Sequence, residues 1–148
     1  MKTLAICLLC LVLFPAAAVA ADYFREVVTV TNDVKISENF TLREFACSCC
    51  NQVMIDPELL RRLQAMRTEA GRPIIINSGY RCLSRNRAIG SQDTSQHRQG
   101  KAADIRIVGL SLAAQRALCE KHFGDGGIGY ANTFTHVDVR GSRARWTY

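Results

Sequence analysis

The stretch Ser-Gln-His-Arg-Gln-Gly-Lys-Ala-Ala-Asp, residues 95–104, determines how we interpret the rest of the chain. It places His97 seven residues before Asp104. An imidazole nitrogen and a carboxylate oxygen are both common metal ligands. A catalytic zinc ion needs a third protein ligand and one open position, so the next question is where a third ligand lies in the sequence.

The first 20 residues have the pattern of a secretory signal peptide. Lys2 precedes an apolar run over residues 4–14, and an Ala-x-Ala site ends at Ala20. The run is shorter than the roughly 20 residues that span a membrane, so we expect cleavage after Ala20 and no stable membrane anchor. We therefore expect a secreted or periplasmic protein with a lead-in over residues 21–37 and one domain over residues 38–148.

Removing these 20 residues from the 148 leaves a chain of 128, which is long enough for one modest hydrophobic core. Its net charge is then near +5, and we expect a monomer. A basic exported protein is attracted to anionic surfaces such as cell-wall polymers. The basic residues are scattered along the sequence rather than clustered, which argues against a nucleic-acid site.

Five cysteines remain after the signal peptide, and in an exported protein disulfides are the default expectation. Because five cannot all pair within the chain, at least one stays free or bonds elsewhere. Reduced thiols and a second metal site in residues 47–50 are the alternatives, although no further Cys or His follows at zinc-finger spacing. The candidate disulfide cysteines are Cys47, Cys49, Cys50, Cys82 and Cys119.

Two helices are predicted from their caps and from the spacing of their apolar residues. The first begins after the Asp56 cap with Pro57 in the first helical position, and it ends at Gly71. The second follows the Ser111 cap and ends near residues 122–124. Both present an apolar stripe, so both are expected to pack against a sheet.

The strands are predicted from short apolar runs and from alternation of apolar and polar residues. Residues 73–77 form a continuous apolar run, and residues 102–108 and 134–140 alternate. Residues 143–148 are expected to return as an antiparallel edge strand. Residues 126–130 are interpreted as a glycine-rich approach to this final pair of strands.

The polar faces of the two alternating strands supply a third candidate ligand. Asp104 lies on one such face, and His136 lies with Asp138 on the other. If the two strands pair, Asp104 and His136 come within metal-binding distance, and His97 reaches in from the preceding loop. Two histidines and one carboxylate with an open fourth position are a typical catalytic zinc set. The alternative is that both histidines have ordinary structural roles.

The chain also resembles the M15 family of zinc peptidases, in the group of zinc D-Ala-D-Ala carboxypeptidases and related murein peptidases. The resemblance covers residues from about 39 to 146, and its motifs are specific when taken together. They are residues 39–45, 78–81, 95–105, 127–130 and 134–140. The resemblance implies a small α+β domain whose antiparallel sheet carries the zinc site, with two main helices packed on that sheet.

The resemblance further implies Zn²⁺ as the cofactor, with three ligands that are His97, Asp104 and His136. It implies that Arg81 binds a substrate carboxylate or stabilises the transition state. Tyr80 and Ser95 belong to motifs that carry the resemblance, and we expect them to bind substrate with Arg81. The implied substrate class is the peptides of peptidoglycan.

One position departs from the family pattern. Several branches of the superfamily place an acidic residue three positions before the last histidine as general base, whereas this chain has Thr133. Asp138 is the best substitute, because it follows His136 by two residues and therefore faces the same side. Asp138 either acts as the base or orients His136 from behind the metal.

Three functions are therefore open. The first is zinc-dependent hydrolysis of peptidoglycan stem peptides by a carboxypeptidase or endopeptidase, with Asp138 and Arg81 as catalytic residues. The second is a non-catalytic, zinc-containing module that binds the cell wall or cell surface, which Thr133 favours. The third is a small extracellular protein that is held by disulfides and contains no metal.

Overall fold

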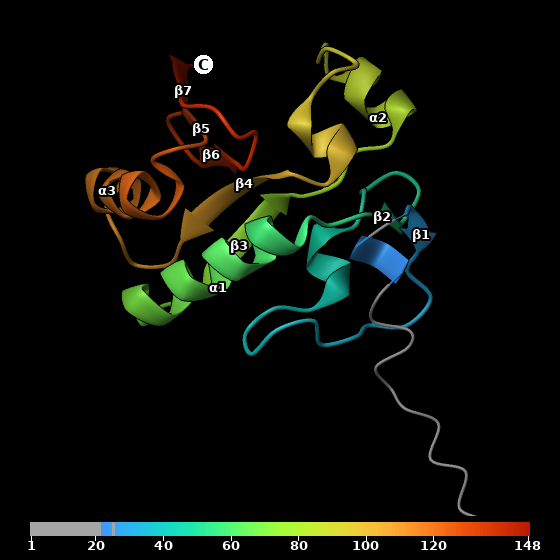
Figure 1. Ribbon diagram of the computed structural model, residues 1–148, viewed down its shortest axis with the longest axis horizontal. Coiled ribbons are helices and arrows are strands. Elements are labelled where there is room, and N and C mark those ends of the chain that lie inside the picture. Colours follow the sequence, from blue (N-terminus) through green and yellow to red (C-terminus); the bar gives the residue numbers. More distant parts are fainter. Residues whose placement is uncertain (1–21, 25) are drawn as a thin grey trace, which may run out of the picture.

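The computed structural model describes residues 22–24 and 26–148, so the expected signal peptide lies outside the described residues. Within the described part, the chain folds into a five-stranded sheet with the helices at residues 57–70 and 112–123 on one side of it, and a second sheet of two strands (Figure 1). In this part no helix is both long enough and apolar enough to cross a membrane.

Helices and strands are interleaved along the chain, which ends in three successive strands. The α-helices are α1 (Pro57–Ala70), α2 (Leu83–Ala88) and α3 (Leu112–Phe123), and the 3-10 helices are η1 (Asp22–Phe24), η2 (Leu42–Phe45) and η3 (Gln96–Gln99). The strands are β1 (Val28–Thr29), β2 (Gln52–Val53), β3 (Ile74–Ser78), β4 (Ala102–Ile107), β5 (Gly127–Tyr130), β6 (Thr135–Asp138) and β7 (Ala144–Thr147). This architecture confirms the predicted α+β class.

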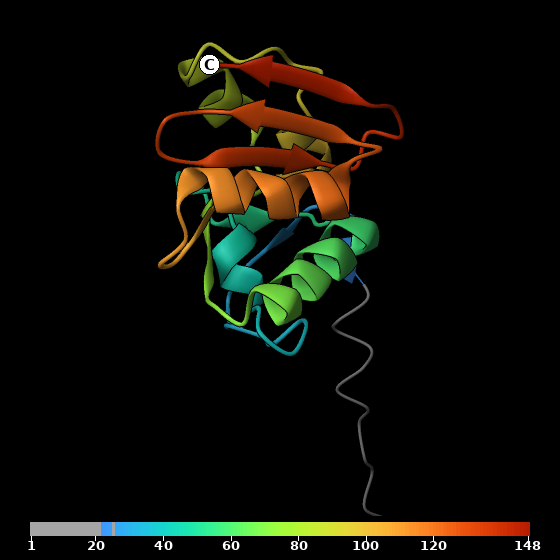
Figure 2. The same cartoon turned by 90° about the vertical axis from the view of Figure 1, so that its left-hand side faces the viewer.

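The five-stranded sheet has the order β3-β4-β6-β5-β7, and its first three pairings are antiparallel. Helices α1 and α3 contact each other, and α3 runs alongside the C-terminal strands (Figure 2). The apolar side chains of the alternating strands, including Ile105, Ile107 and Val137, are fully buried in the core. The polar residues of the same strands therefore face away from this core.

The C-terminal strands differ from the expectation. Residues 127–130 form a full strand, β5, between β6 and β7, and β7 pairs with β5 in parallel. The predicted edge strand is therefore present, but its predicted antiparallel pairing was wrong. The chain does reverse direction after β6, but β5 already occupies the open edge of β6, so the returning strand pairs beyond it.

Helix α1 has the predicted bounds for the predicted reasons. The Asp56 side chain accepts a hydrogen bond from the Glu58 amide at 2.8 Å, and Gly71 adopts a left-handed conformation with φ of 58°. Its buried side chains include Leu63 and Met66, both with no exposed surface. Met66 is thus a core residue, as its helical spacing predicted.

A buried glutamine fixes α3 against the sheet. The Gln115 carbonyl oxygen accepts a hydrogen bond from the Ile107 amide at 2.7 Å. Its amide nitrogen donates to the Ile105 carbonyl at 3.2 Å and to the Thr135 hydroxyl at 2.8 Å. Because these partners lie on β4 and β6, Gln115 joins the helix to the two strands that carry the candidate metal ligands.

The expected lead-in packs on the domain. Strand β1 pairs with β2 in antiparallel register, and the side chains of Tyr23 and Val30 are buried in the hydrophobic core. The Ile55 amide donates a hydrogen bond to the Tyr23 carbonyl at 2.9 Å. Residues on both sides of position 37 therefore share one core.

An ion pair attaches the parallel strand β7 to α3. The Arg145 guanidinium donates to both carboxylate oxygens of Glu120 at 2.7 Å, and the Tyr130 hydroxyl also donates to Glu120. These contacts lower the pKa of Glu120 to about 2, with the hydrogen bond from Arg145 as the largest cause. Strand β7 is thereby held on two sides, by β5 and by α3.

We expect Glu120→Gln to reduce the acid sensitivity of the fold. The folded-state pKa of about 2 lies below an unfolded value of about 4.3, so the pair stabilises the fold above that value and is lost as pH falls toward 2. The Glu120 side chain is 38 % exposed, so solvent screening limits the effect to about 0.5–1 kcal/mol. Urea unfolding at pH 6 and pH 3 measures it. An equal loss of stability on acidification in the variant and the wild type would contradict this role.

Candidate metal centre

Three ligand atoms converge where β4, β6 and η3 meet. Asp104 of β4 lies directly opposite His136 of β6 in the antiparallel register. Asp104 Oδ1 lies 2.9 Å from His136 Nδ1 and 3.3 Å from His97 Nε2, and the two histidine nitrogens are 3.1 Å apart. All three side chains are more than nine-tenths buried. The structure thus brings together the three residues that the sequence singled out.

His97 is oriented by the backbone. Its Nδ1 lies 2.7 Å from the Gly79 carbonyl oxygen, so the Nδ1–H donates there and Nε2 faces the other two ligands. Gly79 itself is pressed against η2, because a side-chain carbon at this position would lie 2.6 Å from the Phe45 carbonyl oxygen. Burial lowers the pKa of His97, although its hydrogen bond with Asp104 acts in the opposite direction.

His136 is oriented by a side chain. Its Nε2 lies 3.0 Å from Asp138 Oδ2, which leaves Nδ1 facing Asp104. Burial alone would lower the pKa of His136, but the hydrogen bonds with Asp104 and Asp138 outweigh burial and raise it. The same hydrogen bonds hold the pKa of both carboxyl groups below the usual range, against the effect of burial.

Asp138 lies behind His136 and has no exposed surface. Its Oδ1 accepts hydrogen bonds from the Gly127 amide at 3.1 Å, the Arg140 amide at 3.1 Å and Arg140 Nε at 2.8 Å. Its Oδ2 accepts from His136 and from Arg140. Both oxygens are therefore engaged on the side of the imidazole that faces away from Asp104, which favours the orienting role over the base role.

The donor set fits Zn²⁺. A tetrahedral zinc ion with bonds of about 2.0–2.1 Å to nitrogen and oxygen separates its ligand atoms by roughly 3.3 Å. The three separations here are 2.9, 3.1 and 3.3 Å, so a small relaxation admits the ion. Each histidine also donates its other ring N–H to an acceptor, as metal-binding histidines almost always do.

Arg81 lies at the exit of β3, next to the ligands. Its guanidinium donates to Asp104 Oδ2 and, through Nε, to the Ser78 hydroxyl at 2.9 Å. The contact with Oδ2 leaves Oδ1 of Asp104 facing the histidines. Arg81 therefore contacts the carboxylate of a candidate metal ligand, and it also lines the cavity next to the two histidines.

A cavity of about 490 Å³ opens over the two histidines. Ser95 lines it, whereas Tyr80 is buried and lines a neighbouring cavity of about 390 Å³ together with Arg81. Thr133 lines a third cavity, one that neither histidine lines. The residues lining the first cavity are Arg81, Ser91, Gln92, Thr94, Ser95, Gln96, His97, His136, Arg140, Trp146 and Tyr148.

The structure adds three residues to those singled out from the sequence. Gly79 orients His97, Arg140 holds Asp138, and the Trp146 ring lies 5.0 Å from the His136 ring and 5.0 Å from the Arg140 guanidinium. Alternation in β6 already placed Arg140 on the face of His136 and Asp138. Trp146 had no comparable signal, because its position depends on the pairing of β7 with β5.

The cysteines divide into two groups. Cys119 is buried in the core on α3, whereas the sulfurs of the other four lie within 4.8 Å of one another: Cys47, Cys49, Cys50 and Cys82. The approach of Cys49 Sγ to Cys82 Sγ, at 3.2 Å, exceeds the S–S bond length of about 2.05 Å. Hydrogen bonds from Ser84 and the Arg85 amide lower the pKa of Cys82 to about 6, and contact with Cys82 raises that of Cys49 to about 12.

Comparison with known proteins now identifies the family. The family model described as Peptidase M15 matches residues 38–138, about two thirds of the chain. The chain belongs to the peptidase M15 family. The matched range contains the three converging ligands and Arg81, and it ends at Asp138.

Relatives of this M15 chain include proteins named as peptidoglycan L,D-endopeptidases and one named as a zinc D-Ala-D-Ala carboxypeptidase. It is 35 % identical over 100 residues to the probable peptidoglycan L,D-endopeptidase MepK of Haemophilus influenzae, covering 60 % of this chain and 53 % of the relative. It is 33 % identical over 100 residues to MepK of Escherichia coli K12, with the same coverage. It is 34 % identical over 88 residues to the zinc D-Ala-D-Ala carboxypeptidase of Streptomyces albus G, covering 57 % and 34 %.

The match spans about half the length of the MepK relatives and about a third of the carboxypeptidase. Membership of a zinc peptidase family, together with the fit of the donor set, identifies Zn²⁺ as the cofactor. The third histidine of the chain, His122, is not part of this site. It lies on α3, and its Nε2 is 2.9 Å from a carboxylate oxygen of Glu69 on α1.

We expect Gly79→Ala to weaken both folding and metal binding. The added carbon would lie 2.6 Å from the backbone oxygen of Phe45 and 2.7 Å from its Cα, so the backbone must shift and move the acceptor of His97. We expect a loss of about 1–3 kcal/mol in unfolding free energy and a weaker affinity for zinc. Urea unfolding and competition with a zinc-binding dye measure the two effects.

Gly90→Ala is the matched control for this substitution. No atom lies within 4 Å of the added carbon, so only the positive φ of 71° costs stability, about 1 kcal/mol. Zinc affinity should stay at the wild-type value in this variant. A Gly79→Ala protein that binds zinc as tightly as Gly90→Ala would refute the proposed coupling between Gly79 and His97.

Proposed function

We propose that this M15 peptidase hydrolyses stem peptides of peptidoglycan with Zn²⁺ held by His97, Asp104 and His136. The supporting observation is the convergence of three ligand atoms, separated by 2.9–3.3 Å, beneath a cavity that Arg81 also lines. The peptidoglycan enzymes among the relatives support the substrate class. A peptidoglycan substrate places the protein in the periplasm or outside the cell, in line with the expected signal peptide.

The chain's own residues prepare the site. Zn²⁺ in this position supplies Lewis acidity, which activates water and polarises the scissile carbonyl. The other ring N–H of each histidine donates to Gly79 or Asp138, which aims Nε2 of His97 and Nδ1 of His136 at the position the ion would occupy. All three ligand side chains are buried, which limits their contact with bulk water.

Arg81 is proposed to bind the substrate. Stem peptides carry carboxylates, and a guanidinium can donate two parallel hydrogen bonds to one carboxylate. The Nε and one Nη of Arg81 are engaged by Ser78 and Asp104, which fix the plane of its guanidinium. The remaining donors are available to a substrate carboxylate or to the charge that develops on the carbonyl oxygen, and Ser95 adds a hydroxyl to the same cavity.

The activity test uses the purified protein and defined muropeptides. We expect hydrolysis that stops when a chelator removes zinc and resumes when zinc is restored, with the products identified by mass spectrometry. Loss of a terminal D-Ala identifies a carboxypeptidase, and cleavage within the peptide identifies an endopeptidase. His97→Ala should lose zinc from this site together with turnover. Hydrolysis that persists in this variant, or a zinc-loaded wild type without hydrolysis, would refute the proposal.

We expect Asp138→Asn to act mainly through metal binding. Its carboxylate orients His136, so its loss should weaken zinc affinity by about 10- to 100-fold, and excess zinc should restore part of the turnover. Zinc titration of the variant, followed by kinetics at saturating zinc, measures both effects. If Asp138 is instead the general base, the variant will bind zinc normally and remain inactive at every zinc concentration. Thr133→Ala, outside this cavity, is the control and should match the wild type.

A non-catalytic wall-binding module is the second candidate. One observation favours it: among the residues lining the cavity in the described part of the chain there is no carboxylate, and Asp138 is fully engaged. Such a module would sediment with purified peptidoglycan and release no cleavage products, whether or not zinc is present. The muropeptide experiment therefore separates the two candidates.

A further inference from the structure

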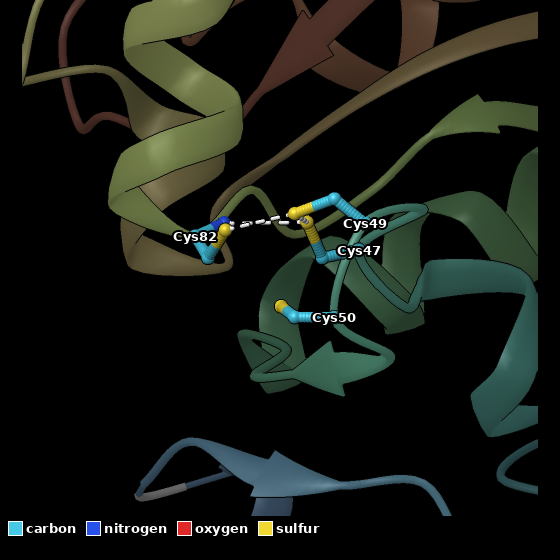
Figure 3. A group of neighbouring side chains, drawn as sticks. All are labelled: Cys47, Cys49, Cys50 and Cys82. Carbon is cyan, nitrogen blue, oxygen red and sulfur yellow. Dashed lines mark hydrogen bonds between the residues drawn. The ribbon is translucent and has the colours of Figure 1, made fainter.

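A second group of metal-binding side chains lies beside the M15 site. One loop supplies three thiols and the residue preceding α2 supplies the fourth, and Figure 3 shows the sulfurs of Cys47, Cys49 and Cys82 close together, with Cys50 set slightly apart on the same loop. Cys47 Sγ lies 3.5 Å from Cys49 Sγ, which lies 3.2 Å from Cys82 Sγ. These contacts join parts of the chain that are more than 30 residues apart.

The loop has the form of a tight metal-binding turn. Cys47 and Cys50 have the Cys-x-x-Cys spacing that is typical of zinc sites. The Asn51 amide donates to the Cys47 carbonyl at 2.9 Å, and the Cys47 amide donates to the Gln52 carbonyl at 2.7 Å, so the turn closes on itself. Asn51 adopts a positive φ of 57°, the only non-glycine residue to do so in the part of the chain that the structure describes. The turn therefore holds its thiols together on the backbone alone.

The separations of the sulfurs suit a tetrahedral ion. Zinc–sulfur bonds of about 2.3 Å place the four sulfurs of a Cys₄ site roughly 3.8 Å apart. Two of the separations are 3.2 and 3.5 Å, and all four sulfurs lie within 4.8 Å of one another, so a small adjustment brings them to this value. Cys47 and Cys82 are buried while Cys49 and Cys50 are exposed, so an ion can enter from solvent and be enclosed on its inner side.

Backbone donors already face the sulfurs. The Cys82 amide donates to Cys47 Sγ at 3.5 Å, and the Arg85 amide donates to Cys82 Sγ at 3.5 Å. The Ser84 hydroxyl lies 3.1 Å from Cys82 Sγ. Donors of this kind stabilise negative charge on sulfur and orient metal-bound thiolates.

A disulfide accounts for fewer of these contacts. Three of the four thiols lie within four consecutive residues, so one cross-link to Cys82 leaves two more thiols in the same turn without a distant partner. Cys119 is buried elsewhere, on α3, and cannot serve as that partner without a rearrangement of the core. One cation, in contrast, engages all four sulfurs at their present separations.

We propose a second, structural Zn²⁺ site whose four ligands are the thiolates of Cys47, Cys49, Cys50 and Cys82. Binding forms four zinc–sulfur bonds, and the protons of the thiols pass to solvent. With four protein ligands, the ion has no open position for substrate or water, so its role is to hold the structure together. This site does not depend on peptidoglycan hydrolysis by the first site.

The second ion would support the first site through the chain. It ties the turn at residues 47–50 to the segment that ends at Cys82, and this segment contains Gly79 and Arg81. Gly79 orients His97, and Arg81 donates to Asp104. The Tyr80 amide also donates to the Phe45 carbonyl at 2.8 Å, so the two segments already meet beside the thiols.

The test counts metal ions in the full chain, purified without added reductant and loaded with zinc. We expect two zinc ions per chain in the wild type and one in each of Cys49→Ser and Cys50→Ser, which change exposed thiols and so spare the core. Ser48→Ala, an exposed residue in the same turn, is the matched control and should keep two. His97→Ala should keep one ion, held by the cysteines.

Cobalt distinguishes the two sites by spectroscopy. Co²⁺ bound by thiolates gives an intense sulfur-to-metal charge-transfer absorption, which nitrogen and oxygen ligands do not give. We expect this absorption in the wild type, in Ser48→Ala and in His97→Ala, and its loss or strong reduction in Cys49→Ser and Cys50→Ser. The intact mass of the protein should show all five cysteines outside the signal peptide as thiols after the metal is removed.

Three results would overturn the proposal. They are an unchanged zinc content in both cysteine variants, a wild-type Co²⁺ protein without the charge-transfer absorption, and peptide masses of the non-reduced protein showing that Cys82 is in a disulfide. A chain that binds two zinc ions but cleaves no muropeptide would refute the proposed hydrolysis and leave this second site standing. A chain that hydrolyses muropeptides but binds one zinc ion and has a Cys82 disulfide would refute the second site and support the proposed hydrolysis.

Discussion

The antiparallel register of β4 and β6 is the constraint on which the metal centre depends. It places Asp104 directly opposite His136, so two ligands from distant parts of the sequence meet without any loop having to be ordered. If either strand slipped by one residue, its ligand would turn into the hydrophobic core, where Ala103, Ile105 and Val137 now pack. The cost of burying an unpaired carboxylate and exposing apolar side chains therefore protects the geometry of the site.

The alternation of polar and apolar residues made these features predictable. It predicted which residues of β4 and β6 share a face, and therefore that Asp104 meets His136. The Asp56 cap and Gly71 predicted where α1 begins and ends. Alternation says nothing about strand order, because order depends on which edges are free when each strand arrives. The glycine-rich β5 has three consecutive buried residues and no alternation, so neither that strand nor the parallel pairing of β7 was predicted.

The hydrogen-bond partners of the side chains could also not be predicted from the sequence. Alternation placed Asp138 on the correct face but could not tell whether its oxygens point toward a substrate or toward Arg140 and the Gly127 amide. The same holds for the cysteines. Three of them are adjacent in the sequence, but the fourth is brought to them by the packing of Gly79 on Phe45, a contact between backbones that leaves no pattern beyond a single glycine.

The two histidines of the metal centre are supported in different ways, and these supports differ in their vulnerability to mutation. His136 depends on the carboxylate of Asp138, so a single substitution can remove its partner. His97 depends on a main-chain carbonyl, which every amino acid possesses, so changes in side-chain chemistry at position 79 cannot delete it. Only a larger side chain at position 79 can displace that carbonyl, because the backbone of Gly79 passes so close to the backbone of Phe45. One ligand is thus sensitive to the chemical identity of its neighbour, and the other is sensitive to its neighbour's size alone.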